Sequence, residues 1–442
     1  MTALFIGLSY QQILVVSIFF VSILGVMFFW EFRLSFLIIG SCLLFLVNSV
    51  DFESFIRFAS LDVLLFIIGV MIVVGMMKET GVFKHITHYI MSMKNITGVK
   101  FFVFMNLLSA LLSSVMGEVT SIMVIMMIIF DVCDTVEISP LPLIISCVFS
   151  TNIGSAATLF GNPIGILIAL RGGISFEEFL THALPVSVII LLIIVSFIGI
   201  FEKKYFRQFN RALAEKKASS GLTLRKPAAL NIKEKASVLF FICMLISIAL
   251  HRRMEIFFGL DENSLLIITP LFFAGIVLAY RHEKALYYIA NEIEWPAILF
   301  FLFLFIEAGI LQASGVAGHV SVKIIKIIGT DPLLLKGLVL FSSGLLSSVL
   351  DNTVVVASFI PAIQNLNLET TGGSLWWALL FGACFGGNIT IIGSTANIVA
   401  LGMLEKEKDI KISFTTWLKY GTIIGFISMI LAFFALLLPG FK

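Results

Sequence analysis

The stretch SSVLDNTVVVASFIPAI, which runs from Ser347 to Ile363, places a carboxylate and an amide, Asp351 and Asn352, inside an otherwise apolar run. Apolar runs continue over most of the chain on both sides of it. An ionised carboxylate at the centre of a bilayer costs about 2.5 to 3.5 kcal/mol on insertion scales. At that depth Asp351 must be paired, hydrated, bound to a metal ion or protonated, so the stretch indicates a functional position.

The composition of the whole chain is that of a polytopic membrane protein. Of its 442 residues, 59% are hydrophobic and 13% are charged, and the mean hydropathy is +1.09; a soluble domain has about 25% charged residues. Roughly 20 helical residues cross the apolar core of a bilayer. We therefore expect an all-α protein in the lipid bilayer of the cell (inner) membrane, with ten crossings near residues 11–30, 33–50, 61–77, 140–170, 184–201, 237–250, 264–280, 295–312, 376–404 and 417–438.

Several other functional classes find no support in the sequence. The net charge is only +2, and the basic residues gather at the ends of apolar segments, so we expect no nucleic-acid partner. The five cysteines lie singly in apolar contexts without CxxC spacing, which predicts neither disulfides nor a structural metal. The chain has no HExxH, GxSxG or P-loop motif, so we expect neither an enzyme nor a cofactor.

Two apolar stretches, residues 100–133 and 333–363, are each interrupted midway by small and polar residues. This pattern is typical of a re-entrant hairpin, which enters the membrane, turns and leaves by the same side. Each stretch could instead be a kinked pair of ordinary spans. The crossings predicted at 140–170 and 376–404 contain similar interruptions, and we interpret them as broken helices.

One long hydrophilic segment, residues 202–236, carries many lysines and arginines. The positive-inside rule places this linker in the cytoplasm. Five basic residues oppose the resulting assignment of sides, namely Arg252, Arg253, Lys323, Lys326 and Lys336.

The chain contains an internal repeat. A shift of 234 residues superposes GMMKETGV on GILQASGV and LLSSVMGEVT on LLSSVLDNTV, so that Leu111 meets Leu345. Five predicted crossings separate equivalent points, and because five is odd the two copies must lie inverted in the membrane. We expect a first repeat over residues 1–201 and a second over residues 237–442. Inverted repeats with interrupted helices are a transporter architecture, with the site near the midplane.

The interruptions supply the candidate ligands. Unwound backbone at membrane depth faces protein or a wet cavity, where its carbonyls coordinate cations and the amino ends of half-helices attract anions. Ser, Thr and Asn add neutral oxygens and amides. In the first half these residues are Ser113, Ser114 and Glu118 at the hairpin tip and Asn152, Thr158 and Asn162 in the broken helix. In the second half they are Ser348, Asp351, Asn352 and Thr353, followed by Asn388, Thr390, Ser394 and Asn397.

Each repeat contributes one acid, because Asp351 and Glu118 occupy adjacent positions of the repeat alignment. Neither the tips nor the broken helices contain a lysine or arginine that could neutralise them. A bound cation and a proton that compete for the same oxygens would do so, which is the chemistry of antiport. The alternative is that each carboxylate only caps a hairpin helix. A third acid within a span, Glu307, could belong to a proton path or could pair with a neighbouring helix.

These motifs resemble the ion transporter superfamily, which includes arsenite permeases, type D sodium/proton antiporters, the melanosomal P protein, and dicarboxylate and citrate carriers. GGNITIIGSTANIVALGMLEKE is similar to the second broken helix of the antiporter and P-protein branch, and SSVLDNTVVVASFIP is similar to its second hairpin. STNIGSAATLFGNP resembles the matching motif of the first half. The likeness covers nearly the whole chain.

The resemblance implies a scaffold domain and a mobile transport domain that moves by an elevator stroke, in a homodimer. It also implies that Asn152, Thr158, Asp351, Asn352, Asn388, Thr390, Ser394 and Asn397 border the site. The first tip reads Gly117-Glu118 where the antiporter branch commonly has Asp-Asn, and Asn162 replaces an Asp. These two departures run against the antiporter branch, but the second tip reads Asp351-Asn352-Thr353 where the dicarboxylate branch carries Ser-Asn-Thr, which favours the antiporter side. We expect a secondary active transporter that exchanges sodium or a related cation for protons. The alternative is a carrier of an anion or neutral oxyacid, such as a dicarboxylate or arsenite.

Overall fold

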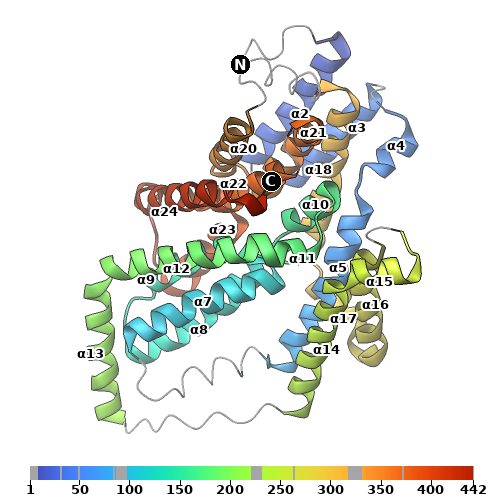
Figure 1. The fold of residues 1–442 in the computed structure, drawn as a ribbon. Coiled ribbons are helices and arrows are strands. Elements are labelled where there is room, and N and C mark those ends of the chain that lie inside the picture. Colours follow the sequence, from blue (N-terminus) through green and yellow to red (C-terminus); the bar gives the residue numbers. More distant parts are fainter. Residues whose placement is uncertain are drawn as a thin grey trace.

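The computed structural model describes residues 8–29, 32–47, 50–82, 85, 97–220, 231–261, 264–316, 331–370 and 373–441. All regular structure in these residues is helical, as expected from the composition (Figure 1). Lys323 and Lys326, which oppose the predicted sidedness, lie outside this part of the chain. A third such residue, Lys336, is buried, and its ammonium donates to the carbonyls of Leu436 and Phe441 at 3.0 and 3.2 Å. Its position is therefore explained by the chain end that it contacts.

The first half of the chain begins with helices that alternate between long spans and short connectors. They are α2 (Tyr10–Phe28), α3 (Arg33–Leu46), α4 (Phe52–Arg57), α5 (Leu61–Thr80), α7 (Gly98–Met116), α8 (Glu118–Val136), α9 (Leu141–Ser155), α10 (Pro163–Gly172), α11 (Phe176–Glu178), η2 (Phe179–Ala183), α12 (Leu184–Phe201) and α13 (Lys203–Ser220). Helix η2 is a π-helical turn that joins α11 to α12 without a break.

The second half has the same alternation. Its helices are α14 (Ile232–Ala249), α15 (His251–Phe258), α16 (Ser264–Tyr280), η3 (His282–Lys284), α17 (Ala285–Tyr287), η4 (Tyr288–Glu292), α18 (Trp295–Ala313), α20 (Pro332–Ser347), α21 (Asn352–Thr370), α22 (Ser374–Gly386), η5 (Ile391–Gly393), α23 (Thr395–Lys408), α24 (Phe414–Ala435) and η6 (Pro439–Phe441).

The number of full-length spans is smaller than the ten predicted. Within the described residues, six helices are long and apolar enough to cross a membrane: Phe52–Thr80, Gly98–Met116, Glu118–Val136, Phe176–Phe201, Trp295–Ala313 and Phe414–Ala435. A seventh arises if Ser264–Tyr280 and the following His282–Glu292, which bend by 101°, count as one span. The difference has two sources. The crossing at 140–170, predicted as a broken helix, is divided between two short helices, α9 and α10, and unbroken helices such as α3 are shorter than a full span.

The interruptions predicted in residues 100–133 and 333–363 are present as breaks between packed helices. Helices α7 and α8 meet at Gly117, whose φ of 88° and ψ of 154° suit glycine alone among the amino acids. Helices α20 and α21 are joined by residues 348–351. Both members of each pair are in contact. Helices α7 and α8 are each long enough to cross a bilayer, which is the alternative that the sequence left open.

The two halves use the same close approach between a hairpin arm and a broken helix. Helix α7 packs against α9, and α20 packs against α22. A Cβ atom on Gly154 would lie 2.3 Å from the Ala110 carbonyl oxygen, and one on Gly386 would lie 2.1 Å from that of Gly344. These positions correspond in the repeat alignment to within two residues. Glycine at both of them lets the backbones touch.

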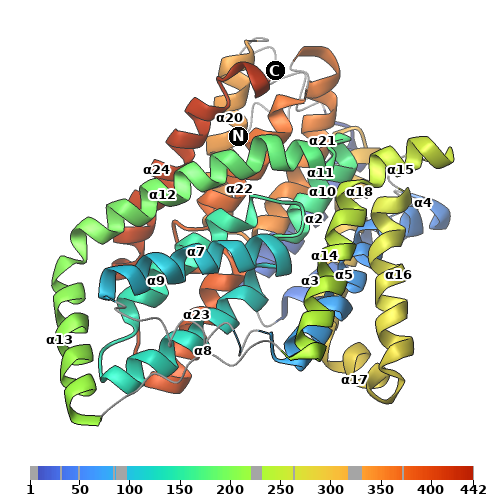
Figure 2. The ribbon, with the colours of Figure 1, turned by 60° about the horizontal axis from the view of Figure 1, so that its bottom comes forward.

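The basic segment 202–236 is not an extended linker in its first part. Residues Lys203–Ser220 form α13, which lies along the edge of the molecule beside α7 and α8 (Figures 1 and 2). Apolar rings on one face of α13 dock it, with the rings of Phe101 and Phe209 stacked 5.4 Å apart. The Asn210 side chain also accepts from the Gly98 amide at 2.7 Å. The fixed part of the segment therefore positions the start of the first hairpin.

Candidate functional site

The two acids from opposite halves of the chain meet at the amino end of α23. The Ser394 hydroxyl donates to Glu118 Oε1 at 3.4 Å, and the hydroxyl of the next residue, Thr395, donates to Asp351 Oδ2 at 3.0 Å. The carboxylates also lie close enough to repel one another. Two hairpin tips and the second broken helix are thereby joined around one cluster of oxygens.

Glu118 is the more buried of the two acids. It is the first residue of α8 and follows directly on Gly117, so the chain reverses and delivers the carboxylate into the interior. Only 9% of Glu118 is exposed, and its Oε2 atom has no hydrogen-bond partner among the described residues. A buried oxygen without a partner is costly unless a proton or a cation satisfies it.

Asp351 is half-buried and caps α21. Its Oδ1 atom accepts from the Thr353 amide at 2.9 Å, so the capping alternative considered for this residue has a structural basis. The guanidinium of Arg33, on α3, lies within electrostatic range of Asp351 and of Glu294. This basic neighbour comes from outside the tips and broken helices, so the sequence pattern did not reveal it. Burial raises the pKa of Glu294, which precedes α18, while Lys78 and Arg33 oppose the shift.

A group of fully buried asparagines lies beside Glu118 and joins the two broken helices. Asn152 donates to the side-chain oxygens of Asn388 and Asn397 at 2.8 and 2.9 Å, and it accepts from Ser394 at 3.0 Å. Asn397 in turn donates to the Gly387 and Thr390 carbonyls at 2.8 and 2.9 Å. The Asn388 Nδ2 atom has no partner among the residues that the structure describes.

In each half of the chain, one threonine connects the helix break to the tip of the hairpin. The Thr158 hydroxyl donates to the Ser114 carbonyl, and the Thr390 hydroxyl donates to the Ser348 carbonyl. Each threonine oxygen also accepts from the amide two residues later, Phe160 at 3.1 Å and Ile392 at 3.2 Å. The two halves therefore use one hydrogen-bond pattern at aligned positions.

Some predicted residues support the site rather than face it. Ser113 donates to the Thr151 carbonyl at 2.8 Å, and Ser114 and Ser348 donate to carbonyls of their own helices at 2.8 and 2.7 Å. Asn162 caps α10 by accepting from the Gly165 amide at 3.0 Å, and it donates to Ser155 at 2.9 Å.

Hydrogen bonds also fix the tip of the second hairpin, between α20 and α21. With its amide nitrogen turned toward the available acceptors, Asn352 donates to the Gly393 and Ala383 carbonyls at 2.7 and 3.1 Å. Thr353 is buried and contributes its backbone amide to Asp351. These bonds give the tip a defined shape against the second broken helix.

The structure adds residues that were not predicted. Thr395 and Ser155 lie inside the quoted polar stretches, so their position in those stretches could have identified them. Cys384 contacts Asn162 at 3.2 Å, and the Trp417 indole donates to the Asn388 carbonyl at 3.2 Å. No polar neighbours in the sequence marked Cys384 or Trp417, because each lies in an apolar helix that packs behind the site.

Glu307 lies apart from this cluster. It is fully buried in α18 against α2 and α3, and neither of its carboxylate oxygens has a hydrogen-bond partner within the described residues. A Cβ atom on Gly40 would lie 2.2 Å from Glu307 Oε1 and 2.0 Å from the Ser22 hydroxyl, so the carboxyl occupies space that glycine leaves. A role in a proton path stays a prediction for this residue.

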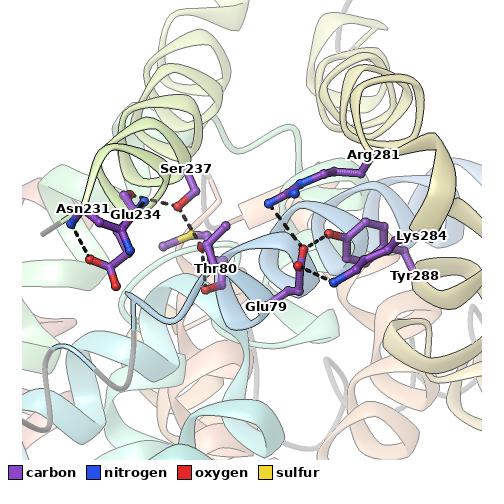
Figure 3. Close-up of polar contacts among 9 residues, drawn as sticks. Glu79, Thr80, Asn231, Glu234, Ser237, Arg281, Lys284 and Tyr288 are labelled. Carbon is purple, nitrogen blue, oxygen red and sulfur yellow. Dashed lines mark hydrogen bonds and ion pairs between the residues drawn. The ribbon is translucent and has the colours of Figure 1, made fainter.

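A second charged region, at the ends of α5 and α16, is internally compensated (Figure 3). Glu79 accepts from Lys284 at 2.6 Å and from the Tyr288 hydroxyl, and Arg281 lies 3.6 Å away. The neighbouring Thr80 bonds Ser237 of α14 at 2.9 Å. These contacts fix α5 to α14 and to the bend after α16. The pairing here contrasts with Glu118, with which no basic side chain in the described part of the chain forms an ion pair.

Comparison with known sequences points to one family. A sequence model of the family described as "Citrate transporter" matches residues 23–284 and 264–440, which together span most of the chain. The matched ranges include both hairpins and both broken helices.

Individual relatives share less than a third of their aligned residues with this chain. An uncharacterized transporter of Mycobacterium tuberculosis is 28% identical over 382 residues, covering 84% of each chain. A 46 kDa membrane protein of Mycobacterium leprae is 29% identical over 400 residues and 88% of each chain. The human P protein is 24% identical over 440 residues, which is 82% of this chain and 50% of the P protein.

Proposed function

This chain belongs to the citrate transporter family, and we propose that it is a secondary active transporter that exchanges a small cation, most simply sodium, for protons. It is an integral membrane transporter with several apolar spans. The observation that carries the proposal is the meeting of Glu118 and Asp351 at the adjacent hydroxyls of Ser394 and Thr395.

The chemistry follows from the surroundings of these carboxylates. Hard cations are bound by carboxylate, carbonyl and hydroxyl oxygens, and both tips and both breaks supply such groups. Arg33 lies within electrostatic range of Asp351, but no basic side chain among the described residues forms an ion pair with Glu118, so the two carboxylates cannot both remain ionised in a dry site without a further counter-charge. Loss of the cation is therefore accompanied by uptake of a proton, and the two occupants exclude one another.

We propose that the halves of the chain are inverted repeats and that the helices around the site move together. Helices α7–α10 and α20–α23 form this transport body, and α2, α3, α5, α14, α16 and α18 form the scaffold. The matched glycine contacts of Gly154 and Gly386 and the matched bonds of Thr158 and Thr390 support a repeat. Alternating access by an elevator stroke of the transport body, in a homodimer, is part of the same proposal.

Proteoliposomes that contain a pH-sensitive dye test the exchange. An inward sodium gradient should alkalise the lumen, because sodium that enters drives protons out, and Asp351→Asn and Glu118→Gln should each remove this flux. Asp131→Asn is a matched control, because Asp131 is an exposed acid on the same helix as Glu118. Flux that survives both substitutions, or that is absent from the wild type at every pH, would contradict the proposal.

A second candidate cargo is an anion or neutral oxyacid. It is favoured by the amino ends of α10 and α23, whose N-cap residues Asn162 and Ser394 are buried, and by Arg33 near Asp351. Thermal unfolding of the purified protein against sodium, lithium, arsenite, succinate and citrate separates the two, since a ligand that binds the native state raises the midpoint. Stabilisation by an oxyanion alone, which Asp351→Asn leaves intact, would favour the second cargo.

A further inference from the structure

A cavity of about 280 Å³ lies outside the cluster of Glu118 and Asp351, and none of the residues of that cluster lines it. Its polar walls are Arg57, Ser60, Arg171, Gln312 and Gln364, and the remainder is apolar. These residues come from the start of the α4–α5 span, from α10, from α18 and from α21. The cavity therefore lies where the proposed scaffold meets the proposed transport body. Helices α4 and α10 lie on the side of the molecule away from α13 (Figures 1 and 2).

The two guanidiniums are only partly compensated. Arg171, at the last turn of α10, donates to the Ser60 hydroxyl at 2.6 Å and lies 3.8 Å from Asp62, which is longer than a hydrogen bond. Arg57 donates to the Ser54 hydroxyl at 3.3 Å and lies beside the Phe58 ring, 5.8 Å from its centroid. Each guanidinium has an acid in its vicinity, Asp62 for Arg171 and Asp51 for Arg57, but among the described residues neither arginine forms a hydrogen-bonded ion pair with that acid.

Amide groups complete the wall opposite the arginines. Gln312 of α18 donates to the side-chain oxygen of Gln364 of α21 at 2.6 Å. This bond uses one of the four amide N–H groups of the pair, so the remaining N–H groups can serve as donors. Guanidinium and amide N–H groups together form a donor-rich wall, which suits an acceptor-rich ligand.

We propose that this cavity binds a small polyvalent oxyanion, of the size of a dicarboxylate or tricarboxylate, as a site separate from the helix breaks. Planar guanidiniums match carboxylate oxygens with two parallel hydrogen bonds each. The volume, about 280 Å³, is just below the range of typical ligand pockets, which begins at about 300 Å³, so the ligand must be small. The mixed lining, with a few donors among apolar side chains, is typical of a pocket that orients a small molecule.

Occupancy of this cavity should oppose movement, which is an inference that rests on the elevator motion proposed above. Arg57 ends α4, which forms one span with α5 of the scaffold. The ligand would contact Arg57 and Gln312 on the scaffold side and Arg171 and Gln364 of the transport body at once. A ligand stabilises the conformation that it binds best. The anion therefore holds one arrangement of the two bodies and slows exchange.

The binding step is tested without transport, by isothermal titration calorimetry of the full-length protein in detergent. The probes are citrate, succinate, inorganic phosphate and chloride, and a parallel arm uses nanodiscs with or without an anionic phospholipid. Citrate should bind more tightly than chloride, and Arg171→Gln and Arg57→Gln should each weaken it by roughly tenfold or more, as expected for a lost charge-assisted bond. Arg253→Gln is the matched control, because Arg253 pairs with Glu177 at 3.1 Å on the surface and does not line the cavity.

Each outcome decides the inference. Citrate binding that is unchanged in both arginine variants, or no binding of any polyvalent anion, overturns it. Displacement of citrate by the anionic lipid, sensitive to the same two arginines, supports an oxyanion site whose occupant is a lipid headgroup. Asp351→Asn should leave citrate binding intact while it removes cation exchange, so failure of the proposed function and failure of this site give different results.

Discussion

Among single residues, Gly117 has no side chain, yet its backbone conformation positions Glu118 in the site. The chain reverses within this residue and presents Glu118 to Ser394. No atom lies within 4 Å of where a Cβ would be, so a substitution acts through the backbone conformation alone. With φ at 88° and ψ at 154°, any other residue is strained.

Gly117→Ala should therefore destabilise the protein by about 1 to 3 kcal/mol. The thermal unfolding midpoint in detergent, followed by intrinsic fluorescence, measures this. Gly402→Ala is the control, because Gly402 lies in α23 without a positive φ and with open space around it. Equal midpoints for both variants would contradict the assigned backbone strain.

Residue types predicted much of the site but not its connections. Asn, Ser and Thr inside apolar runs indicated the breaks, and Asn152, Asn388, Asn397 and Ser394 do lie in one buried cluster. The approach of Arg33 to Asp351 depends on tertiary packing between segments far apart in the chain, so no local pattern could reveal it.

At the scale of helices, close backbone contact organises both breaks. Gly154 and Gly386 let α9 and α22 touch α7 and α20, and these contacts hold the tips beside the breaks. Small residues at helix contacts are favoured in membranes because they permit such approach.

Gly154→Ala and Gly386→Ala should each be destabilising, by about 1 to 3 kcal/mol or more, because the new methyl group meets backbone that cannot move aside cheaply. The midpoint of thermal unfolding again reports the change. Gly275→Ala, in α16 with open space around it, should be neutral by comparison. Tolerance of alanine at both Gly154 and Gly386 would show that the backbones are not in contact.

The end of α12 provides a pH-dependent prediction. Burial raises the pKa of Glu202, which follows the span and borders a groove with α9 and α24. When folding raises the pKa of a carboxyl, the folded state is at its most stable below the unfolded pKa. This stability is lost as pH rises through the folded pKa, because the buried carboxyl must then ionise. Glu202→Gln has no charge to bury, so its unfolding midpoint should match the wild type near pH 4 and exceed it at neutral pH. A difference that stays constant from acid to neutral pH would refute this.

The helical elements were partly predictable. Hydropathy located the apolar segments, but it overestimated the number of full spans, because the length of an apolar run does not show where a helix breaks. The bend of 101° after α16 is an example, whereas the division of 140–170 into α9 and α10 was expected from the polar residues that interrupt this run. The docking of α13 depends on the contact of Phe209 with Phe101. Phe209 is surrounded by basic residues in the sequence, so its neighbours did not indicate a packed helix.

At the scale of the whole molecule, the proposal separates a scaffold from a transport body. Gln312 of α18 and Gln364 of α21 form a 2.6 Å hydrogen bond across this boundary. Lys408 and Asp134 form a 2.5 Å ion pair within the transport body, between α23 and α8.

A short bifunctional thiol reagent on Gln312→Cys with Gln364→Cys should therefore abolish transport, whereas the same reagent on Lys408→Cys with Asp134→Cys should spare most of it. The exposed Cys42 and Cys243 would first be replaced by serine. Initial rates in proteoliposomes before and after reduction of a cleavable reagent measure the effect. Full activity of the first pair while cross-linked would rule out relative movement of α18 and α21.

The central claim is that a cation and a proton compete for Glu118 and Asp351. The most direct measurement is the proton release that follows addition of sodium to the purified protein in weakly buffered detergent with a pH indicator. Saturable release is expected from the wild type, and none from the Glu118→Gln, Asp351→Asn double variant. Saturable sodium binding without any release of protons, or equal release from the double variant, would contradict it.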